Sequence, residues 1–231
     1  MKRELDGEAD GVIVEPYSSE ADVILPTESA KPVVLVGTGI ETDRLFTSVM
    51  TDHGKLGKSL ADAVIQGKAV KVGILSGNQS QLGMRQRLKS VKDKLEEAGI
   101  EISWILSEKE LDKKMRNVEY FAEHPVDTVI SLDNDDTEKA VDIILNDDRI
   151  SWKLYGEGRS EKLIYYLDKG TIQELAVPNE YYMGYQSIVL AAQNIRYYTD
   201  KTEQAEVEFY MVSKDNLYDE ETNRILFPAV R

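Results

Sequence analysis

Short apolar segments recur along the whole chain, and they constrain its fold more than any other feature. They span residues 11–16, 32–37, 47–52, 71–77, 101–106, 127–133, 152–156, 172–177 and 206–213. Runs of this length that are apolar throughout are typical of parallel strands buried on both faces. Between them, apolar residues repeat at helical spacing, as at Leu56, Leu60 and Val64. Alternating strands and helices with short connections predict an α/β fold of the doubly wound kind.

Four further segments have the apolar spacing of a helix with one buried face. Their apolar stripes are Leu88, Val91 and Leu95; Leu111, Met115, Val118 and Ala122; Leu163, Ile164 and Leu167; and Met183, Ile188, Ala192 and Ile195. Gly99 and Gly170 are placed to end the first and third of these helices, and Pro125 follows the second.

Composition excludes several classes of protein. The net charge of −14 opposes binding to nucleic acid, whose phosphates would be repelled. The chain has no cysteine and only two histidines, which lie far apart in the sequence, so no metal site and no cofactor are predicted. No apolar run approaches the roughly 20 residues that span a bilayer. The charged start MKRELDGEADG is not followed by an apolar segment, so a soluble chain without a signal peptide is predicted.

Polar side chains stand at the ends of several predicted strands. The candidates are Asp52 and His53, Arg85, Asp133 and Asn134, Glu157, and Asn179. The glycine pairs in GTG (37–39) and YGEG (155–158) lack the third glycine of a dinucleotide loop, so they are weak evidence for phosphate binding. The candidates include no pair of nucleophile and base. The pattern therefore predicts a site that holds a polar molecule without changing it.

The order and spacing of these segments resemble the type 1 periplasmic binding proteins, the sugar-binding family that shares its fold with the effector domain of LacI-type repressors. The resemblance is carried by DGVIVEP (10–16), KPVVLVGTG (31–39), SVMTDHGKLGKSLADAV (48–64), ILSGNQSQLGMRQRLKSVKDKLEEAGI (74–100), VDTVISLDNDDTEKAV (126–141) and the stretch from YGEG to AAQNI (155–195), which contains MGY. It covers nearly the whole chain.

The resemblance implies two Rossmann-like lobes with parallel sheets, joined by three crossing segments around a ligand cleft. One lobe would comprise residues 1–52 and 179–207, and the other residues 53–178 and 208–231. The crossings would lie near Asp52, Pro178 and Val212. The implied ligand-binding residues are Asp52, Arg85, Asp133, Asn134, Glu157 and Asn179. Tyr181 and Tyr182 would either line the cleft or pack at the start of a helix, and packing is expected for at least one of them. Glu157 stands where many members have Asp, and Pro178 where Gln is frequent, so the ligand's identity stays open.

The resemblance also implies that the chain is truncated at its N-terminus. The family begins with a strand, a helix and a second strand before the segment that matches residues 10–16, so the first lobe is expected to be incomplete. Residues 11–14 would then form an exposed apolar edge strand, so either self-association through this lobe or poor order of the lobe is expected. Sugar binding by the chain as given is expected to be weak or absent, because part of the cleft would be missing. A signal or anchor would lie upstream. The expected location is periplasmic or extracellular, or cytoplasmic if the chain is expressed as given.

The function implied by the resemblance is capture of a small polar ligand, most simply a sugar, for ABC-type uptake or sensing. The expected partners are an ABC permease or a membrane sensor. One alternative is the effector domain of a LacI-type repressor that lacks its DNA-binding head. The tail EVEFYMVSKDNLYDEETNRILFPAVR (206–231) favours a binding protein, because repressor tails stop soon after their last strand. A doubly wound enzyme is the second alternative, although a phosphate loop and a nucleophile–base pair are missing from the sequence pattern.

Overall fold

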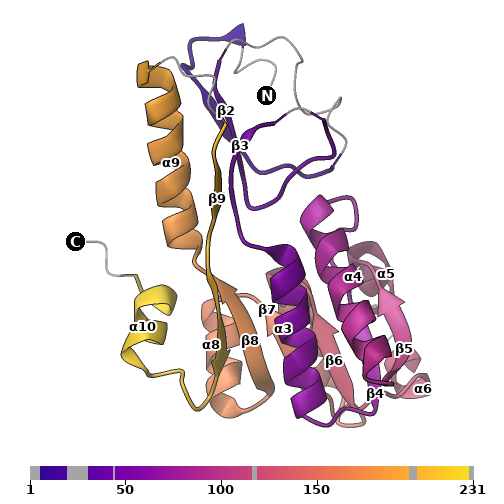
Figure 1. Cartoon of the computed structure of the whole chain (residues 1–231). Helices are drawn as coiled ribbons and strands as arrows, with labels where there is room; N and C mark the ends of the chain where they lie inside the picture. The colour runs from indigo at the N-terminus through magenta and orange to yellow at the C-terminus, as the bar shows by residue number, and fades with distance from the viewer. Residues whose placement is uncertain (1–5, 20–30, 44, 116–118, 198–201, 229–231) are drawn as a thin grey trace. The chain divides into compact units, whose positions relative to one another are not determined.

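The computed structural model describes residues 6–19, 31–43, 45–115, 119–197 and 202–228. The chain divides into two compact units (Figure 1). Unit 1 contains Met1–Asp52, Ser80–Arg85 and Asn179–Glu208, and unit 2 contains His53–Gln79, Gln86–Pro178 and Phe209–Arg231. Each unit has its own sheet, so the expected α/β class with parallel-dominated sheets is confirmed. The grouping differs from the predicted division at Ser80–Arg85 and at Glu208, which belong to unit 1.

Unit 1 is a parallel sheet covered by one long helix. The strands, in sheet order, are β1 (Val12–Val14), β2 (Val33–Val36), β3 (Thr47–Met50) and β9 (Gln204–Glu206). Helix α9 (Glu180–Tyr197) packs on β2 and β3. Among the described residues, β1 forms one edge of this sheet, as expected from the sequence.

The buried face of α9 differs from the predicted stripe. Met183, Ser187, Leu190 and Ala191 are buried, and the apolar members of this face pack with residues of β2 and β3. These positions are separated by three or four residues and therefore share one helix face. The predicted stripe was wrong at Ile188, which is 63% exposed, and at Ala192, which is also exposed. The step of five residues from Met183 to Ile188 turns the side chain away from the sheet.

Unit 2 contains a larger, mostly parallel sheet. In sheet order its strands are β10 (Phe209–Ser213), β8 (Ile172–Pro178), β7 (Lys153–Glu157), β6 (Thr128–Ser131), β4 (Lys71–Leu75) and β5 (Glu101–Leu106). All neighbouring pairs are parallel except β10 with β8, which is antiparallel.

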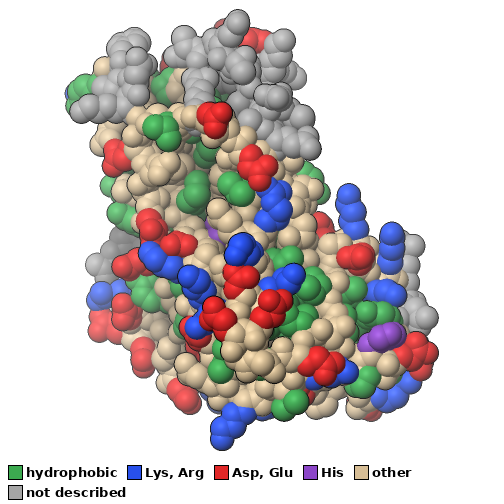
Figure 2. Space-filling view, turned by 45° about the vertical axis from the view of Figure 1, so that its right-hand side comes forward, with side chains coloured by type: hydrophobic (Ala, Val, Ile, Leu, Met, Phe, Trp, Pro, Cys, Tyr) green, Lys and Arg blue, Asp and Glu red, His purple; other side chains and the backbone are tan. Residues whose placement is uncertain are grey.

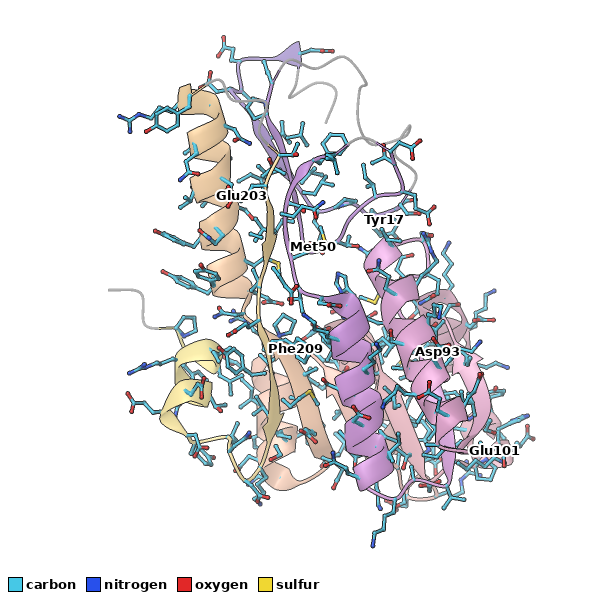
Figure 3. All side chains as sticks on the ribbon, in the orientation of Figure 1. Tyr17, Met50, Asp93, Glu101, Glu203 and Phe209 are labelled. Atoms are coloured by element: carbon cyan, nitrogen blue, oxygen red, sulfur yellow. The ribbon has the colours of Figure 1, made fainter. Side chains whose placement is uncertain are left out.

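The final predicted strand, 206–213, is two strands that belong to different sheets. Val207 N donates a hydrogen bond of 2.9 Å to Met50 O at the end of β3. Two residues later, Phe209 pairs with Pro178 of β8 (Met50 and Phe209 are labelled in Figure 3). The sequence of this run does not reveal the change of partner, because backbone hydrogen bonds join strands whatever their side chains are.

Seven helices lie in unit 2 or continue into it, within the described residues. They are α3 (His53–Gln66), α4 (Leu82–Glu97), α5 (Glu108–Met115), α6 (Glu119–Glu123), α7 (Asn134–Asn146), α8 (Glu161–Lys169) and α10 (Glu220–Leu226). Figure 1 shows α3 and α4 side by side in front of the sheet. Helix α7 packs on β6 and β7, and α8 packs on β8. The predicted helical stripe from Leu111 to Ala122 is divided between α5 and α6, and its member Val118 lies outside the described residues.

Helix α8 shows how local sequence sets element ends. The Ser160 side chain accepts a hydrogen bond from Leu163 N, which satisfies a backbone donor that has no partner inside the helix. Gly170 closes the helix in the left-handed conformation (φ 81°), which glycine adopts without steric cost. The predicted end of this helix at Gly170 is confirmed.

Charged side chains of both signs are mixed on the visible surface. Figure 2 shows Lys and Arg interleaved with Asp and Glu over this face, with no continuous basic patch on it. Among the described residues, no helix combines the length and the apolar character that crossing a membrane requires.

Candidate ligand-binding site

The strand order of unit 2 places a topological switch point beside β4. Strand β4 lies between β5 and β6, so the chain moves in one direction from β4 to β5 and in the other direction from β6 onward. In open α/β sheets, ligands bind outside the carboxyl ends of the strands at such a point. The residues that follow β4 and β6, and the last residue of β7, are Ser76 and Gly77, Leu132 and Asp133, and Glu157.

A buried arginine lies among these strand ends. Arg87 of α4 donates from Nη1 to Leu132 O at 2.5 Å and from Nε to His53 Nδ1 at 3.0 Å. Its Nη1 lies 3.3 Å from Glu157 Oε2. Arg87, His53 and Glu157 are 5%, 5% and 7% exposed. Arg87, His53, Leu132 and Glu157 are called the guanidinium cluster below.

One nitrogen of this buried guanidinium keeps its hydrogens available. Within the described residues, Nη2 of Arg87 donates no hydrogen bond. The one fully enclosed side-chain polar atom without a partner among those residues is Thr51 Oγ1, so Nη2 is not sealed from solvent. A buried cation with two unused N–H donors beside a carboxylate is suited to a polar ligand.

The predicted ligand residue Arg85 has hydrogen-bond partners in unit 1. Its Nη2 lies 3.0 Å from Ser19 Oγ and 2.5 Å from Glu41 Oε1, all within unit 1. Residues two apart on a helix point in nearly opposite directions, so the side chains of Arg85 and Arg87 leave α4 on different sides. The sequence contained the signal for Arg87, because positions 87, 91 and 95 repeat every four residues and Val91 and Leu95 are buried.

Asp133 and Asn134 organise the start of α7. The Asp133 side chain caps the helix by accepting from Asp136 N at 2.8 Å, and burial raises the pKa of Asp133. Asn134 Oδ1 accepts from Arg159 N at 3.2 Å and from Ser160 N at 3.3 Å, so it ties α7 to the loop after β7. Both residues therefore lie at the carboxyl ends of β6 and β7, and both have structural hydrogen bonds there.

Asp136 was not predicted as a site residue, and it is fully buried. Its Oδ2 accepts from Gly77 N at 3.2 Å, and its Oδ1 lies 3.3 Å from Lys139 Nζ. Burial, with a further contribution from the Asp133 carboxylate, raises the pKa of Asp136 from 3.8 to about 7. The sequence pattern alone does not distinguish Asp136 from its exposed neighbour Asp135, since both stand in the first turn of a helix.

The raised pKa of Asp136 predicts a pH-dependent stability. Between about pH 4 and 7 the folded chain keeps a proton on Asp136 that the unfolded chain releases, so the free energy of unfolding falls as the pH rises through this window. Asp136→Asn is expected to remove this contribution to the pH dependence of the free energy of unfolding, whose slope is at most about 1.4 kcal/mol per pH unit. Relative to wild type, the variant gains stability between pH 4 and pH 8 in urea unfolding. The exposed Asp135→Asn is the control, and parallel stability profiles for wild type and Asp136→Asn would refute the assignment.

The other predicted residues lie at the boundaries of the units. Asp52 is the last residue of the first segment of unit 1, and Pro178 ends β8 in unit 2. Asn179 Oδ1 accepts from Tyr182 N at 3.0 Å at the start of α9, as a helix cap does. Val212 lies inside β10, buried and paired with Leu175, whereas the chain leaves unit 1 at Glu208. The third crossing is therefore placed before Val212, because a strand paired along its length leaves no room for a hinge.

The tyrosines at the start of α9 do not form part of the unit 1 core. Tyr181, Tyr182 and Tyr185 are 54%, 44% and 57% exposed. The rings of Tyr182 and Tyr185 stack with centroids 6.4 Å apart. The alternative that Tyr181 or Tyr182 packs at the helix start therefore finds no support in the core of unit 1.

A surface depression of about 330 Å³ lies away from the guanidinium cluster, before the first residues of β6 and β7. Phe121, Arg149 and Trp152 are among its lining residues. The Arg149 guanidinium is already held by Asp147 at 2.7 Å and Glu119 at 3.1 Å. Because the two strands are parallel, this depression lies at the end of the sheet opposite the guanidinium cluster.

Comparison with solved structures gives the same fold. A carbohydrate transporter solute-binding protein from Agrobacterium radiobacter, solved with D-arabinose, has a TM-score of 0.85 and 16% identity, covering 97% of this chain and 81% of that chain. GanP, a glucose-galactose binding protein from Geobacillus stearothermophilus, has a TM-score of 0.81 and 21% identity, covering 94% and 81%. The Caulobacter myo-inositol binding protein has a TM-score of 0.83 and 17% identity, covering 96% and 80%.

Sequence comparison gives the family. No curated protein sequence matches the chain. A family model described as the periplasmic binding protein domain matches residues 1–198, which is most of the 231 residues. That family is one of binding proteins rather than enzymes, in agreement with the sequence interpretation. The chain belongs to the periplasmic binding protein domain family.

Proposed function

We propose that this chain is the solute-binding component of a sugar uptake or sensing system, and that the guanidinium cluster supplies the contacts of unit 2 to the sugar. The observation that carries the proposal is the buried Arg87, whose Nη2 has no acceptor among the described residues and stands beside Glu157. A sugar hydroxyl both donates and accepts hydrogen bonds, so one hydroxyl can accept from the guanidinium while it or its neighbour donates to the carboxylate.

The charge of the cluster favours a neutral ligand. Arg87 and Glu157 carry opposite charges 3.3 Å apart, so the pair presents strong hydrogen-bonding groups with little net charge. The similar solved structures were obtained with D-arabinose, D-fucose and myo-inositol, all neutral polyhydroxy compounds. We propose a ligand of this class for the present chain, with Asp52, Asn134, Asp133 and Asn179 as further candidate contacts.

The proposed setting follows from the same family. A periplasmic or extracellular location is proposed, with an ABC permease or a membrane sensor as the partner that detects the bound state. The similar structure from Agrobacterium radiobacter is that of a transporter solute-binding protein.

A thermal-shift panel tests the proposed function. The panel contains D-arabinose, D-fucose, myo-inositol, D-tagatose, D-glucose and D-galactose. A ligand at 100 times its dissociation constant adds about 2.7 kcal/mol of stability, which raises the Tm of a chain of this size by roughly 5–10 °C. At least one sugar is expected to give a shift of this order. If all six sugars leave the Tm unchanged at millimolar concentration, the proposed ligand class is wrong.

We also propose that the chain self-associates through β1. This strand forms an edge of the described sheet, and Ile13 is 40% exposed. An apolar edge strand can pair with a second chain, so Ile13→Lys is expected to lower the average mass measured by size-exclusion chromatography with light scattering. Ile188→Lys, on the exposed face of α9, is the matched control and should leave the mass unchanged. A monomeric wild-type chain, or an effect of Ile188→Lys alone, would contradict the proposal.

A further inference from the structure

His53 contacts Arg87 in a way that fixes its own protonation. Its Nδ1 lies 3.0 Å from Arg87 Nε, and both side chains are buried. An arginine Nε–H can only donate, so Nδ1 must accept and cannot carry a proton. The ring is then neutral, with its proton on Nε2, an assignment that follows from the hydrogen-bond network.

The surroundings of His53 favour this neutral form. His53 is the first residue of α3, a helix of 14 residues, and the positive end of a helix dipole disfavours a cation. The guanidinium of Arg87 is a second positive charge in direct contact, and it is shared with the Glu157 carboxylate. Protonation of His53 would put a second cation beside the buried guanidinium of Arg87. Nδ1 of His53 could then no longer accept the hydrogen bond from Arg87 Nε–H.

Helix α3 holds the backbone of Arg87 as well as its side chain. Gly57 stands one turn after His53, so the two residues share a face of α3. A Cβ added at Gly57 would lie 2.6 Å from Arg87 O and 3.1 Å from its Cα. The absence of a side chain at Gly57 lets α3 and α4 approach each other at Arg87, where His53 reaches the guanidinium.

We infer that His53 is a positioning residue for Arg87, an inference that rests on the proposed sugar-binding function. With Nε held by His53 and Nη1 held by Leu132 O, two points of the planar guanidinium are fixed and its rotation is prevented. Nη2 is the nitrogen that this arrangement leaves for a ligand. Groups held in place before binding lose less freedom on binding, so the positioning increases affinity.

Two substitutions distinguish the role of His53 as a hydrogen-bond acceptor from the role of its side-chain volume in packing. In His53→Asn the side-chain oxygen Oδ1 is bonded to Cγ, as Nδ1 is in histidine, so a hydrogen-bond acceptor is retained at the same distance along the side chain. In His53→Leu a similar volume is kept and the acceptor is lost. His124→Leu is the control, because His124 is the other histidine of the chain, is exposed and stacks on Tyr120.

The first readout is spectroscopic and needs no ligand. The Arg87 Nε–H resonance is assigned in a ¹H–¹⁵N spectrum by its loss in Arg87→Met. It is expected to be protected from exchange in wild type, His53→Asn and His124→Leu, and unprotected in His53→Leu. The ¹⁵N shifts of the wild-type His53 ring should be those of the neutral Nε2–H tautomer at neutral pH. A proton on Nδ1 of His53 in wild type would overturn the inference, and this observation needs no variant. Protection of the Arg87 Nε–H in His53→Leu equal to that in wild type would overturn it as well.

The second readout is the dissociation constant for the panel sugar that gives the largest thermal shift. His53→Leu is expected to weaken binding about tenfold or more, because a hydrogen bond to a charged group is lost, while His53→Asn stays within about threefold of wild type. Weak binding by both variants would assign the contribution of His53 to packing and overturn its role as an acceptor. If wild type binds none of the panel sugars, the proposed function fails, and the spectra alone then decide whether His53 positions Arg87.

Discussion

Replacing Arg87 by methionine is expected to lower the free energy of unfolding by roughly 3–5 kcal/mol and to abolish sugar binding. Methionine fills a similar volume but leaves the Glu157 carboxylate without its ion pair in a place where it is only 7% exposed. Leu132 O and His53 Nδ1 lose their donor in the same step. Removing one member of a buried pair costs much more than the pair itself contributes, because the remaining charge stays buried.

A double-mutant cycle measures this coupling. Arg87→Met, Glu157→Gln and the double variant are compared with wild type by urea unfolding. The double variant should be less destabilised than the sum of the single changes, since each single change leaves a charge behind. The matched control is Lys89→Met on the same helix, which removes the exposed ion pair with Asp93 (labelled in Figure 3) and should change stability little. Additive effects of Arg87→Met and Glu157→Gln would mean that the two residues do not form a coupled pair.

Replacing Gly57 by alanine is expected to destabilise the chain although alanine is the better helix former. Alanine in a helix interior is favoured over glycine by about 1 kcal/mol. The new Cβ would, however, lie 2.6 Å from the backbone oxygen of Arg87, so α3 and α4 must move apart. Overpacking of this kind costs about 1–3 kcal/mol. We therefore expect a net loss of up to about 2 kcal/mol, together with weaker sugar binding, because the displacement moves Arg87 itself.

A second glycine provides the control for this result. Gly184 lies within α9, and a Cβ there would meet no atom within 4 Å. Gly184→Ala is therefore expected to stabilise the chain by about 0.5–1 kcal/mol, through helix propensity alone. Urea unfolding of both variants gives the comparison. If Gly57→Ala raised stability as Gly184→Ala does, the two helices would not be in close contact at Arg87.

The central strands of the fold were predictable because both faces of their sheet are covered. A strand with helices on both faces of its sheet needs apolar residues at consecutive positions, and β4, β6 and β7 are almost wholly buried. Such runs are visible in the sequence without knowledge of their partners. Which strands pair with one another is harder to predict, because the backbone hydrogen bonds between strands do not depend on side-chain identity. The run 206–213 therefore looked like one strand, although it pairs first with β3 and then with β8.

The sequence points to the edge of the sheet at which we propose the site, and it points less clearly to the residues of that site. Polar residues after β6 and at the end of β7 pointed to this edge of the sheet, and Glu157 lies there. The family pattern alone selects Arg85. Burial on α4 selects Arg87, whose position continues the spacing of Val91 and Leu95. His53 stood among the polar residues at strand ends, but its contact with Arg87 could not be predicted, and Gly57 gave no signal. Both roles depend on the crossing of α3 and α4, which no local pattern encodes.

Calorimetric titration of Glu157→Gln tests the central claim most directly, since the substitution keeps the shape of the side chain and removes its charge. The titrant is the panel sugar that gives wild type its largest thermal shift. If Arg87 and Glu157 hold the sugar hydroxyls, the dissociation constant of Glu157→Gln should rise about tenfold or more, as expected for the loss of a charge-assisted hydrogen bond. A dissociation constant within about threefold of wild type, measured on a folded variant, would show that the sugar binds elsewhere and would contradict the account.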